Sequence, residues 1–435
     1  MSNAVVVIVI MFGLLIGLII LRVPISYSLG FAVLPILFLT PRITPIMLLS
    51  RMMIQYGTII LIAIPFFLLA ANIMNESGIT KKLIRFSQAL VGWLPGGLGH
   101  INVLVSMIFA GMSGSSNADA AGIGGVLIPA MIKEGYDKNF TVAVTACSAV
   151  MGVIIPPSIL MIVWGGVLGL SVSGLFLSGF VPGVMIGISQ MILVYIYARK
   201  RKYPVMAKFD FKEVSASFKE SILAFFTPVI IIGGILGGFV TATEASLLAV
   251  IYALILGIII YRSLPLKGVS PLLLKTGQMA SLVLFAVGTA SIYAWVLAYF
   301  KIPQFLVNTI GSLTTSPLLM LFLLVLIFLF VGTFMDAVPA IIILGPLLKP
   351  LADSVGIHPL HFGIVGIMSL AFGLVTPPYG LCLLIASQIA GINCMQAIKE
   401  VGVFLLVMLI VLIIVICFPN ISLYVPRLFM PSLFY

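Results

Sequence analysis

Long apolar runs alternate with short polar segments along the whole chain. As a helix, a run of about 20 apolar residues is long enough to cross about 30 Å of hydrocarbon. This pattern predicts membrane-spanning helices at residues 4–21, 23–40, 57–75, 179–197, 221–240, 246–261, 277–300 and 401–418. The sequence therefore predicts an all-α integral membrane protein that is surrounded by a lipid bilayer.

Composition excludes a soluble protein. Of the 435 residues, 62% are hydrophobic and 8% are charged, whereas a soluble domain carries about 25% charged residues. The formal net charge of +11 does not indicate a nucleic-acid partner, because the basic residues lie in short segments between apolar runs. The four cysteines have no paired spacing, which argues against a disulfide framework or a metal site. The first apolar run follows Met1 without a basic region or a cleavage site, so we expect a retained span and no signal peptide.

The two halves of the chain share residues at a constant offset of 221 positions. Twelve identities occur without a gap over positions 109–160, and they include Pro156-Pro157, which matches Pro377-Pro378. The alternative is a chance similarity between two apolar, glycine-rich stretches. A repeated Pro-Pro pair in gapless register favours an internal duplication, with repeats at residues 1–215 and 216–435.

The distribution of positive charge predicts how the repeats are oriented. If the amino terminus is outside, 17 of the 22 Lys and Arg residues are cytoplasmic, as the positive-inside rule requires. Each half then has five crossings plus one segment that enters and leaves on the same side. Because five is odd, the second copy is inverted relative to the first, an architecture of secondary transporters.

The segment that turns back covers residues 98–133 in the first repeat and 317–350 in the second. In the first, each arm has roughly 15 residues, too few for a full crossing, so we predict a re-entrant helical hairpin in each half. The alternative is an ordinary polar loop outside the bilayer. The tips hold polar side chains and a helix amino end, which suit a carboxylate and Na⁺. These side chains are Ser113, Ser115, Ser116, Asn117 and Asp119 in the first tip and Thr333 and Asp336 in the second.

Each hairpin precedes a segment that we predict to be a broken helix, at about 139–169 and 361–390. Two adjacent prolines remove backbone donors, so the helix cannot continue through them. The break should leave backbone carbonyls free to hold Na⁺, those of Val153, Ile154, Ile155, Leu374, Val375 and Thr376. The alternative is a simple kink that neighbouring helices satisfy.

Four segments together resemble one family, the large membrane subunit of tripartite ATP-independent periplasmic (TRAP) transporters. They are Phe109–Ala120, Gly152–Ser158, Thr241–Ala245 and Gly373–Pro378, and the resemblance extends over essentially the whole chain. Ala242 departs from the family pattern, in which a proline is expected at this position.

The resemblance implies a subunit of the bacterial inner membrane with a periplasmic amino terminus. It would import small organic acids such as C4-dicarboxylates or sialic acids together with Na⁺, the coupling ion. A periplasmic substrate-binding protein and a small four-helix membrane subunit would be its partners. Transport would follow an elevator mechanism, in which a domain with both hairpins and both broken helices moves against a scaffold.

The resemblance also implies roles for the tip and break residues. The first tip and first break would form one Na⁺ site, the second tip and second break another, and the substrate would lie between them. The implied substrate ligands are Ser115, Ser116, Asn117, Asp119 and Asp336. The implied Na⁺ ligands, partly through backbone carbonyls, are Ser113, Ser115, Asn117, Ile154, Pro156, Thr333, Asp336, Thr376 and Pro377.

Two other functions stay open at this point. One is a stand-alone ion or organic-anion transporter that needs no binding protein. The other is a channel, although no filter-like run occurs in the sequence. The sequence has no phosphate-binding loop, catalytic triad or zinc motif, so we expect neither an enzyme nor a bound cofactor.

Overall fold

The protein is described here by a computed structural model that covers residues 2–311 and 314–434. Over these residues the chain is helical and contains no β-strand. Within this described part of the chain, seven helices are long and apolar enough to cross a membrane, and several shorter apolar helices accompany them. The predicted all-α, multi-pass architecture is therefore confirmed.

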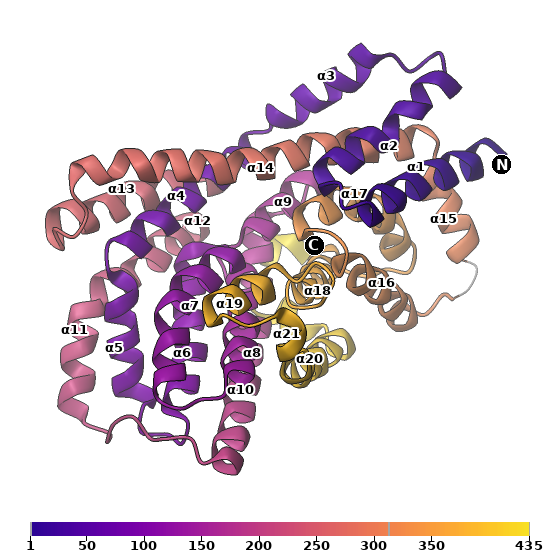
Figure 1. Ribbon diagram of the computed structural model, residues 1–435. Helices are drawn as coiled ribbons and strands as arrows, with labels where there is room; N and C mark the ends of the chain where they lie inside the picture. Colours follow the sequence, from indigo (N-terminus) through magenta and orange to yellow (C-terminus); the bar gives the residue numbers. More distant parts are fainter. Residues whose placement is uncertain (1, 312–313, 435) are drawn as a thin grey trace.

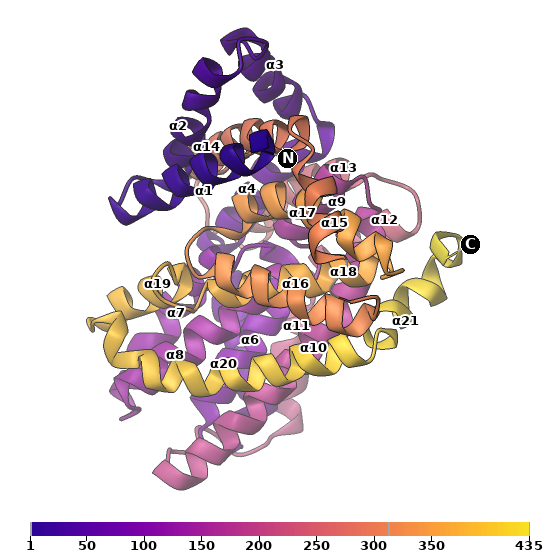
Figure 2. The ribbon, with the colours of Figure 1, turned by 90° about the vertical axis from the view of Figure 1, so that its right-hand side faces the viewer.

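The first five helices and the helices from the middle of the chain lie along the outside of the molecule, with α3 and α14 at the top, α5 and α11 at the lower left and α15 at the right of Figure 1; Figure 2 gives a second view. The early ones are α1 (Ser2–Ile20), α2 (Ile25–Leu39), α3 (Pro45–Tyr56), α4 (Ala63–Glu76) and α5 (Ile79–Val91). The later ones are α11 (Phe211–Pro228), α12 (Gly234–Leu236), α13 (Ala242–Leu254), α14 (Leu266–Tyr299) and α15 (Ile302–Ile310). The long helix α14 contacts α2, α3 and α4 and ties this group together.

The remaining helices form the centre of the molecule. In the first half these are α6 (Gly97–Ser113), α7 (Ser116–Lys133), α8 (Lys138–Ala149), α9 (Ile159–Leu168) and α10 (Val172–Arg201). In the second half they are α16 (Pro317–Gly332), α17 (Ala337–Ser354), α18 (Pro359–Gly373), α19 (Leu381–Ala390), α20 (Cys394–Cys417) and α21 (Asn420–Phe429). The pairs α6/α7 and α16/α17 coincide with the two predicted hairpins. Their re-entry from one side of a membrane stays a prediction.

The offset of 221 positions reappears in the helices. Shifting α7 by 221 residues gives residues 337–354, which are the bounds of α17. The contacts follow the same rule, because α7 packs against α19 and α17 packs against α9. A β-carbon on Gly124 would lie 3.4 Å from Cδ1 of Ile389, and one on Gly345 would lie 3.4 Å from Cδ1 of Leu168. Each half thus inserts a glycine of its hairpin against the broken helix of the other half, a close approach that small residues allow in membrane proteins.

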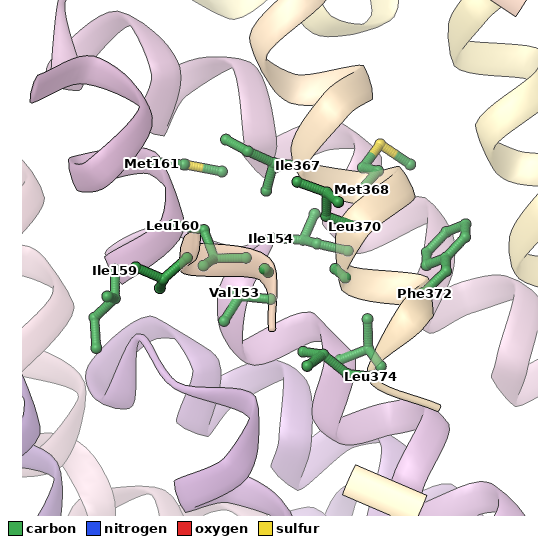
Figure 3. Packing of buried hydrophobic residues seen from close by; sticks show 14 of the residues in the cluster. Val153, Ile154, Ile159, Leu160, Met161, Ile367, Met368, Leu370, Phe372 and Leu374 are labelled. Atoms are coloured by element: carbon green, nitrogen blue, oxygen red, sulfur yellow. The ribbon is translucent and has the colours of Figure 1, made fainter. Parts of the chain in front are cut away.

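Part of the hydrophobic core lies where the two broken helices meet. Figure 3 shows side chains of both breaks facing each other, among them Val153, Ile154, Leu160, Ile367, Leu370 and Leu374. Trp164 of α9 is fully buried and packs against Phe328 of α16 and Phe362 of α18, with ring centroids 5.7 and 5.4 Å away. This aromatic packing holds α9 of the first broken helix against the second hairpin and the second broken helix.

Two features differ from the expectation. Helix α3, which begins at Pro45 after the capping residue Thr44, was not predicted, because Arg51 interrupts its apolar pattern. Helix α11 begins at Phe211, a few residues before the predicted repeat boundary at 215/216. The division of the chain into repeats at 1–215 and 216–435 stays a prediction.

Candidate functional site

The first hairpin tip is a tight polar turn between α6 and α7. Gly114 has φ +64°, a left-handed conformation that glycine adopts without strain. Ser115 then caps α7, because its Oγ accepts a hydrogen bond from the backbone N–H of Ala118 at 3.5 Å. The N–H of Ser115 donates to Oγ of Ser113 at 3.4 Å. The predicted residues Ser113 and Ser115 therefore shape the turn itself.

The tip is joined to the first break by two hydrogen bonds. The N–H of Ile159 donates to the carbonyl of Gly114 at 3.2 Å, and Oγ of Ser116 donates to the carbonyl of Val150 at 3.3 Å. A β-carbon on Gly114 would lie 3.0 Å from the carbonyl oxygen of Pro157. These hydrogen bonds thus join the first hairpin tip to the first broken helix.

Within the first break, one predicted free carbonyl is not free. Ser158 caps α9 and its Oγ donates to the carbonyl of Val153 at 2.6 Å, so the prediction for Val153 is wrong. The carbonyl of Ile154 lies against Gly179 of α10, where a β-carbon would be 2.4 Å away. The carbonyl of Pro156 lies on the side of α6, 3.9 Å from the position of a β-carbon on Gly111.

Asp119, in the first turn of α7, is fully buried. Neither of its carboxylate oxygens has a hydrogen-bond partner among the described residues. Its Oδ2 lies 2.2 Å from the position of a β-carbon on Gly152, so the carboxylate rests directly on the first broken helix. A buried carboxylate without a partner is energetically unfavourable, which marks it as a functional candidate.

The second tip is organised around Asp336. The N–H of Val338 donates to Oδ1 of Asp336 at 3.1 Å, so Asp336 caps α17 in the position that Ser115 occupies at α7. The hydroxyl of Tyr379 donates to Oδ2 of Asp336 at 3.0 Å. The N–H of Tyr379 also donates to the carbonyl of Thr333 at 3.0 Å. One tyrosine therefore links the second tip to the second break.

The second break again differs from the prediction at one carbonyl. The carbonyl of Leu374 accepts a hydrogen bond from the N–H of Cys382 at 2.9 Å, so the prediction that it is free is wrong. The hydroxyl of Thr376 donates to the carbonyl of Phe372 at 2.8 Å. Thr376 and the following Pro377 are half-buried.

The two halves meet at α19, which begins after the second break. Asn117 of the first tip lies with its Oδ1 3.5 Å from Sγ of Cys382. Asp336 of the second tip contacts Tyr379, three residues before Cys382. The structure thus brings Asn117 and Asp336 to one short segment, although 219 positions separate them in the chain. Tyr379 and Cys382 were missed, and their closeness to Pro377-Pro378 was the only signal in the sequence.

The site offers oxygen atoms of several kinds but no dense cluster of ionisable ligands. Among the described residues, no group of three or more His, Cys, Asp or Glu side chains could hold a metal ion. A bound cation would therefore depend on carbonyl, hydroxyl, amide and single carboxylate oxygens, the ligands that hard cations prefer. A cavity of about 440 Å³ opens beside Asn117 and Ala118.

The fold and this paired site define a polytopic membrane transporter. A solved structure of similar fold is the YdaH transporter of Alcanivorax borkumensis, with a TM-score of 0.59 over 94% of this chain and 97% of that one, at 16% identity. The chain belongs to the DctM component family of the tripartite ATP-independent periplasmic transporters, whose family model matches residues 12–421. The predicted family is confirmed.

Two relatives show how closely the chain follows this family. It is 37% identical to the sialic acid TRAP transporter large permease protein SiaM of Vibrio cholerae, over 95% of this chain and 97% of the relative. It is 36% identical to the C4-dicarboxylate TRAP transporter large permease protein DctM of Pseudomonas aeruginosa, over 84% and 86%. Both relatives are permeases and not enzymes, in agreement with the transporter prediction.

Proposed function

We propose that this chain is the large membrane subunit of a Na⁺-coupled secondary importer of small organic acids. The observation that carries the proposal is the meeting of both hairpin tips at one broken helix, through Asn117–Cys382 and Asp336–Tyr379. Inverted repeats with interrupted helices and a central site are typical of secondary transporters. The family membership supports the same activity.

The two tips suit ligands of opposite charge. The first tip presents Ser115, Asn117 and the amino end of α7, which attract a carboxylate. The second presents the carboxylate of Asp336, which attracts a cation. Asp119 adds a second carboxylate beside the first break and is a further candidate for cation binding.

The substrate class is supported by the relatives. One is named for sialic acid and another for C4-dicarboxylates, at 37% and 36% identity to this chain. These substrates share a small size and at least one carboxylate. We infer that a small organic acid is the substrate, and the nearly equal identities favour neither kind.

The assembly would contain two further proteins in the bacterial inner membrane and periplasm. A small four-helix membrane subunit would complete the complex, and a periplasmic binding protein would deliver the acid to the outer face. The helices α6–α9 and α16–α19 would move as an elevator against α1–α5 and α11–α15. The amino terminus would face the periplasm, as the positive-inside rule favours.

Uptake by the complex in proteoliposomes tests this proposal. Asn117→Ala and Asp336→Ala should each abolish Na⁺-dependent uptake of N-acetylneuraminate or succinate without preventing membrane insertion. Asp353→Ala is the matched control, because Asp353 lies near the far end of α17 and is ion-paired with Lys349 at the surface. Unchanged uptake in both tip variants would refute the site.

The same assay separates the alternatives. Uptake should require the binding protein, and a stand-alone transporter would work equally well without it. Currents that pass through single molecules would instead indicate a channel.

A further inference from the structure

The cavity beside Asn117 lies between the first hairpin and the helices α4, α5 and α14. Its volume is about 440 Å³, within the range of pockets that hold small molecules. The hairpin side is formed by Asn117, Ala118, Ala121 and Gly122. The opposite side is formed by polar and charged side chains, namely Asn72, Asn75, Glu76, Thr80, Lys81 and Lys275.

The side chains that line the cavity differ in exposure, since Asn72 and Thr80 are buried and Ala121 is exposed. Asn117 and Asn75 are half-buried, whereas Lys81, Lys275 and Glu76 are exposed. In the orientation that the positive-inside rule favours, both lysines lie on the cytoplasmic side. The cavity therefore runs from the first hairpin tip towards the cytoplasm.

The two lysines of the cavity are free of ion pairs. Five ion pairs occur among residues 2–311 and 314–434, and neither Lys81 nor Lys275 takes part in them. By contrast, Arg85 on the same helix as Lys81 is bound by two glutamates. Lys82 also differs, since its ammonium lies over the ring of Tyr261, 4.0 Å from the centroid. Among the described residues that line the cavity, Lys81 and Lys275 thus bring two unpaired positive charges against the one unpaired negative charge of Glu76, which leaves the cavity net positive.

The wall that carries these lysines is held by hydrogen bonds. Nδ2 of Asn72 donates to Oγ1 of Thr276 at 2.9 Å, which joins α4 to α14 next to Lys275. Oγ1 of Thr80 donates to Oδ1 of Asn75 at 3.1 Å, next to Lys81. The positions of both lysine backbones are therefore fixed relative to each other.

We propose that this cavity is the release route for the organic acid and that Lys81 and Lys275 receive its carboxylate on the way to the cytoplasm. This inference rests on the proposed function. An anion leaving Asn117 meets two unpaired cations in the cavity. Because these ammonium groups are exposed, water and salt weaken their attraction for a carboxylate. The lysines can therefore bind the acid weakly and release it again.

Thiol labelling tests the charge of the cavity without any substrate. Ala121→Cys places a thiol on the hairpin side of the cavity, in a chain whose two accessible cysteines are replaced by Cys394→Ser and Cys417→Ser. The rate constants are measured with an anionic sulfonatoethyl and a cationic trimethylammonium-ethyl methanethiosulfonate, added from the cytoplasmic side. The ratio of the anionic to the cationic rate constant reports the local potential.

Lys81→Gln combined with Lys275→Gln should lower this ratio by roughly threefold or more at physiological salt. Lys82→Gln and Lys267→Gln are the matched controls, because they lie on the same two helices but do not line the cavity. Lys81→Arg with Lys275→Arg should restore the ratio. An unchanged ratio in the double Gln variant, or a thiol that reacts only from the periplasmic side, would overturn the proposal.

Transport kinetics give the second test. In the double Gln variant, the KM for N-acetylneuraminate or succinate on the cytoplasmic side should rise by roughly threefold or more. The KM for acid delivered by the binding protein should stay the same. If the wild type shows no Na⁺-dependent transport of either acid, the proposed function is refuted. The ratio of thiol-labelling rate constants then tests the positive charge of the cavity by itself. If the wild type transports but the cytoplasmic KM is unchanged, the release route is refuted.

Discussion

The approach of α18 to α16 at two glycines allows a direct test of the fold. Gly373 ends α18 and Gly332 ends α16, and a β-carbon on Gly373 would lie 2.1 Å from the carbonyl oxygen of Gly332. It would also lie 2.3 Å from the carbonyl carbon of Gly332. Both atoms belong to the backbone and cannot rotate away. Gly373→Ala therefore forces α16 and α18 apart by roughly an ångström, close to the second tip.

Overpacking of this kind destabilises a protein by about 1–3 kcal/mol, and we expect Gly373→Ala to lie at the upper end. A β-carbon on Gly152, the counterpart of Gly373 in the first half, would lie 2.2 Å from Oδ2 of Asp119, which is the end of a side chain. Gly152→Ala should therefore be milder. Gly125 in α7 has no atom within 4 Å of its β-carbon position, so Gly125→Ala should be stabilising by up to about 1 kcal/mol.

Heating the detergent-solubilised protein for a fixed time and measuring the fraction that stays monodisperse gives a midpoint for each variant. A fixed time is needed because unfolding of such a protein is often irreversible. The expected order of midpoints is Gly373→Ala lowest, Gly152→Ala next, and Gly125→Ala at or above the wild type. A wild-type midpoint for Gly373→Ala would refute the backbone contact between α16 and α18.

Three further variants test other contacts. Tyr379→Phe removes the hydroxyl that donates to Asp336 at 3.0 Å. Hydrogen bonds to charged groups are worth about 1.5–3 kcal/mol, so the Na⁺ concentration for half-maximal uptake should change at least about tenfold. An unchanged dependence of uptake on Na⁺ concentration would count against this contact. Asn72→Ala removes the buried hydrogen bond between α4 and α14 and should lower stability by about 1 kcal/mol or more, which the same heating assay measures. Gly122→Ala places a methyl group 2.5 Å from Oδ1 of Asn75, between α7 and α4. This substitution should slow the initial rate of uptake without loss of folded protein. A wild-type rate of uptake would show that these two helices do not move past each other.

Spacing and backbone chemistry predicted much of the fold. The offset of 221 positions placed the two hairpins and breaks, since glycine and proline act on the backbone locally and leave the same signal in each copy. The class of protein followed from apolar runs alone. Helix α3 was not visible, because twelve residues with Arg51 among them match neither a span nor a loop.

The hydrogen bonds of the breaks could not be predicted from the sequence. Freed carbonyls were expected at both breaks, yet Ser158 binds Val153 and the N–H of Cys382 binds Leu374. Ser158 donates to a carbonyl five residues earlier, and Cys382 at the start of α19 donates to a carbonyl before the prolines. Both hydrogen bonds depend on the path that the chain takes after the Pro-Pro pair. The contact of Asp336 with Tyr379 depends on tertiary packing for the same reason.

The two halves have similar helices at their tips but place their carboxylates at different positions. At the start of the second hairpin helix, position 336 is an aspartate, whereas its counterpart in the first half is Ser115. In the first half the carboxylate is Asp119, one turn further along, where it meets Gly152. Gly373, the counterpart of Gly152, meets the backbone of Gly332 instead. Substitution at the tips alone is therefore enough to place a carboxylate at the helix cap in one half and one turn further along the helix in the other.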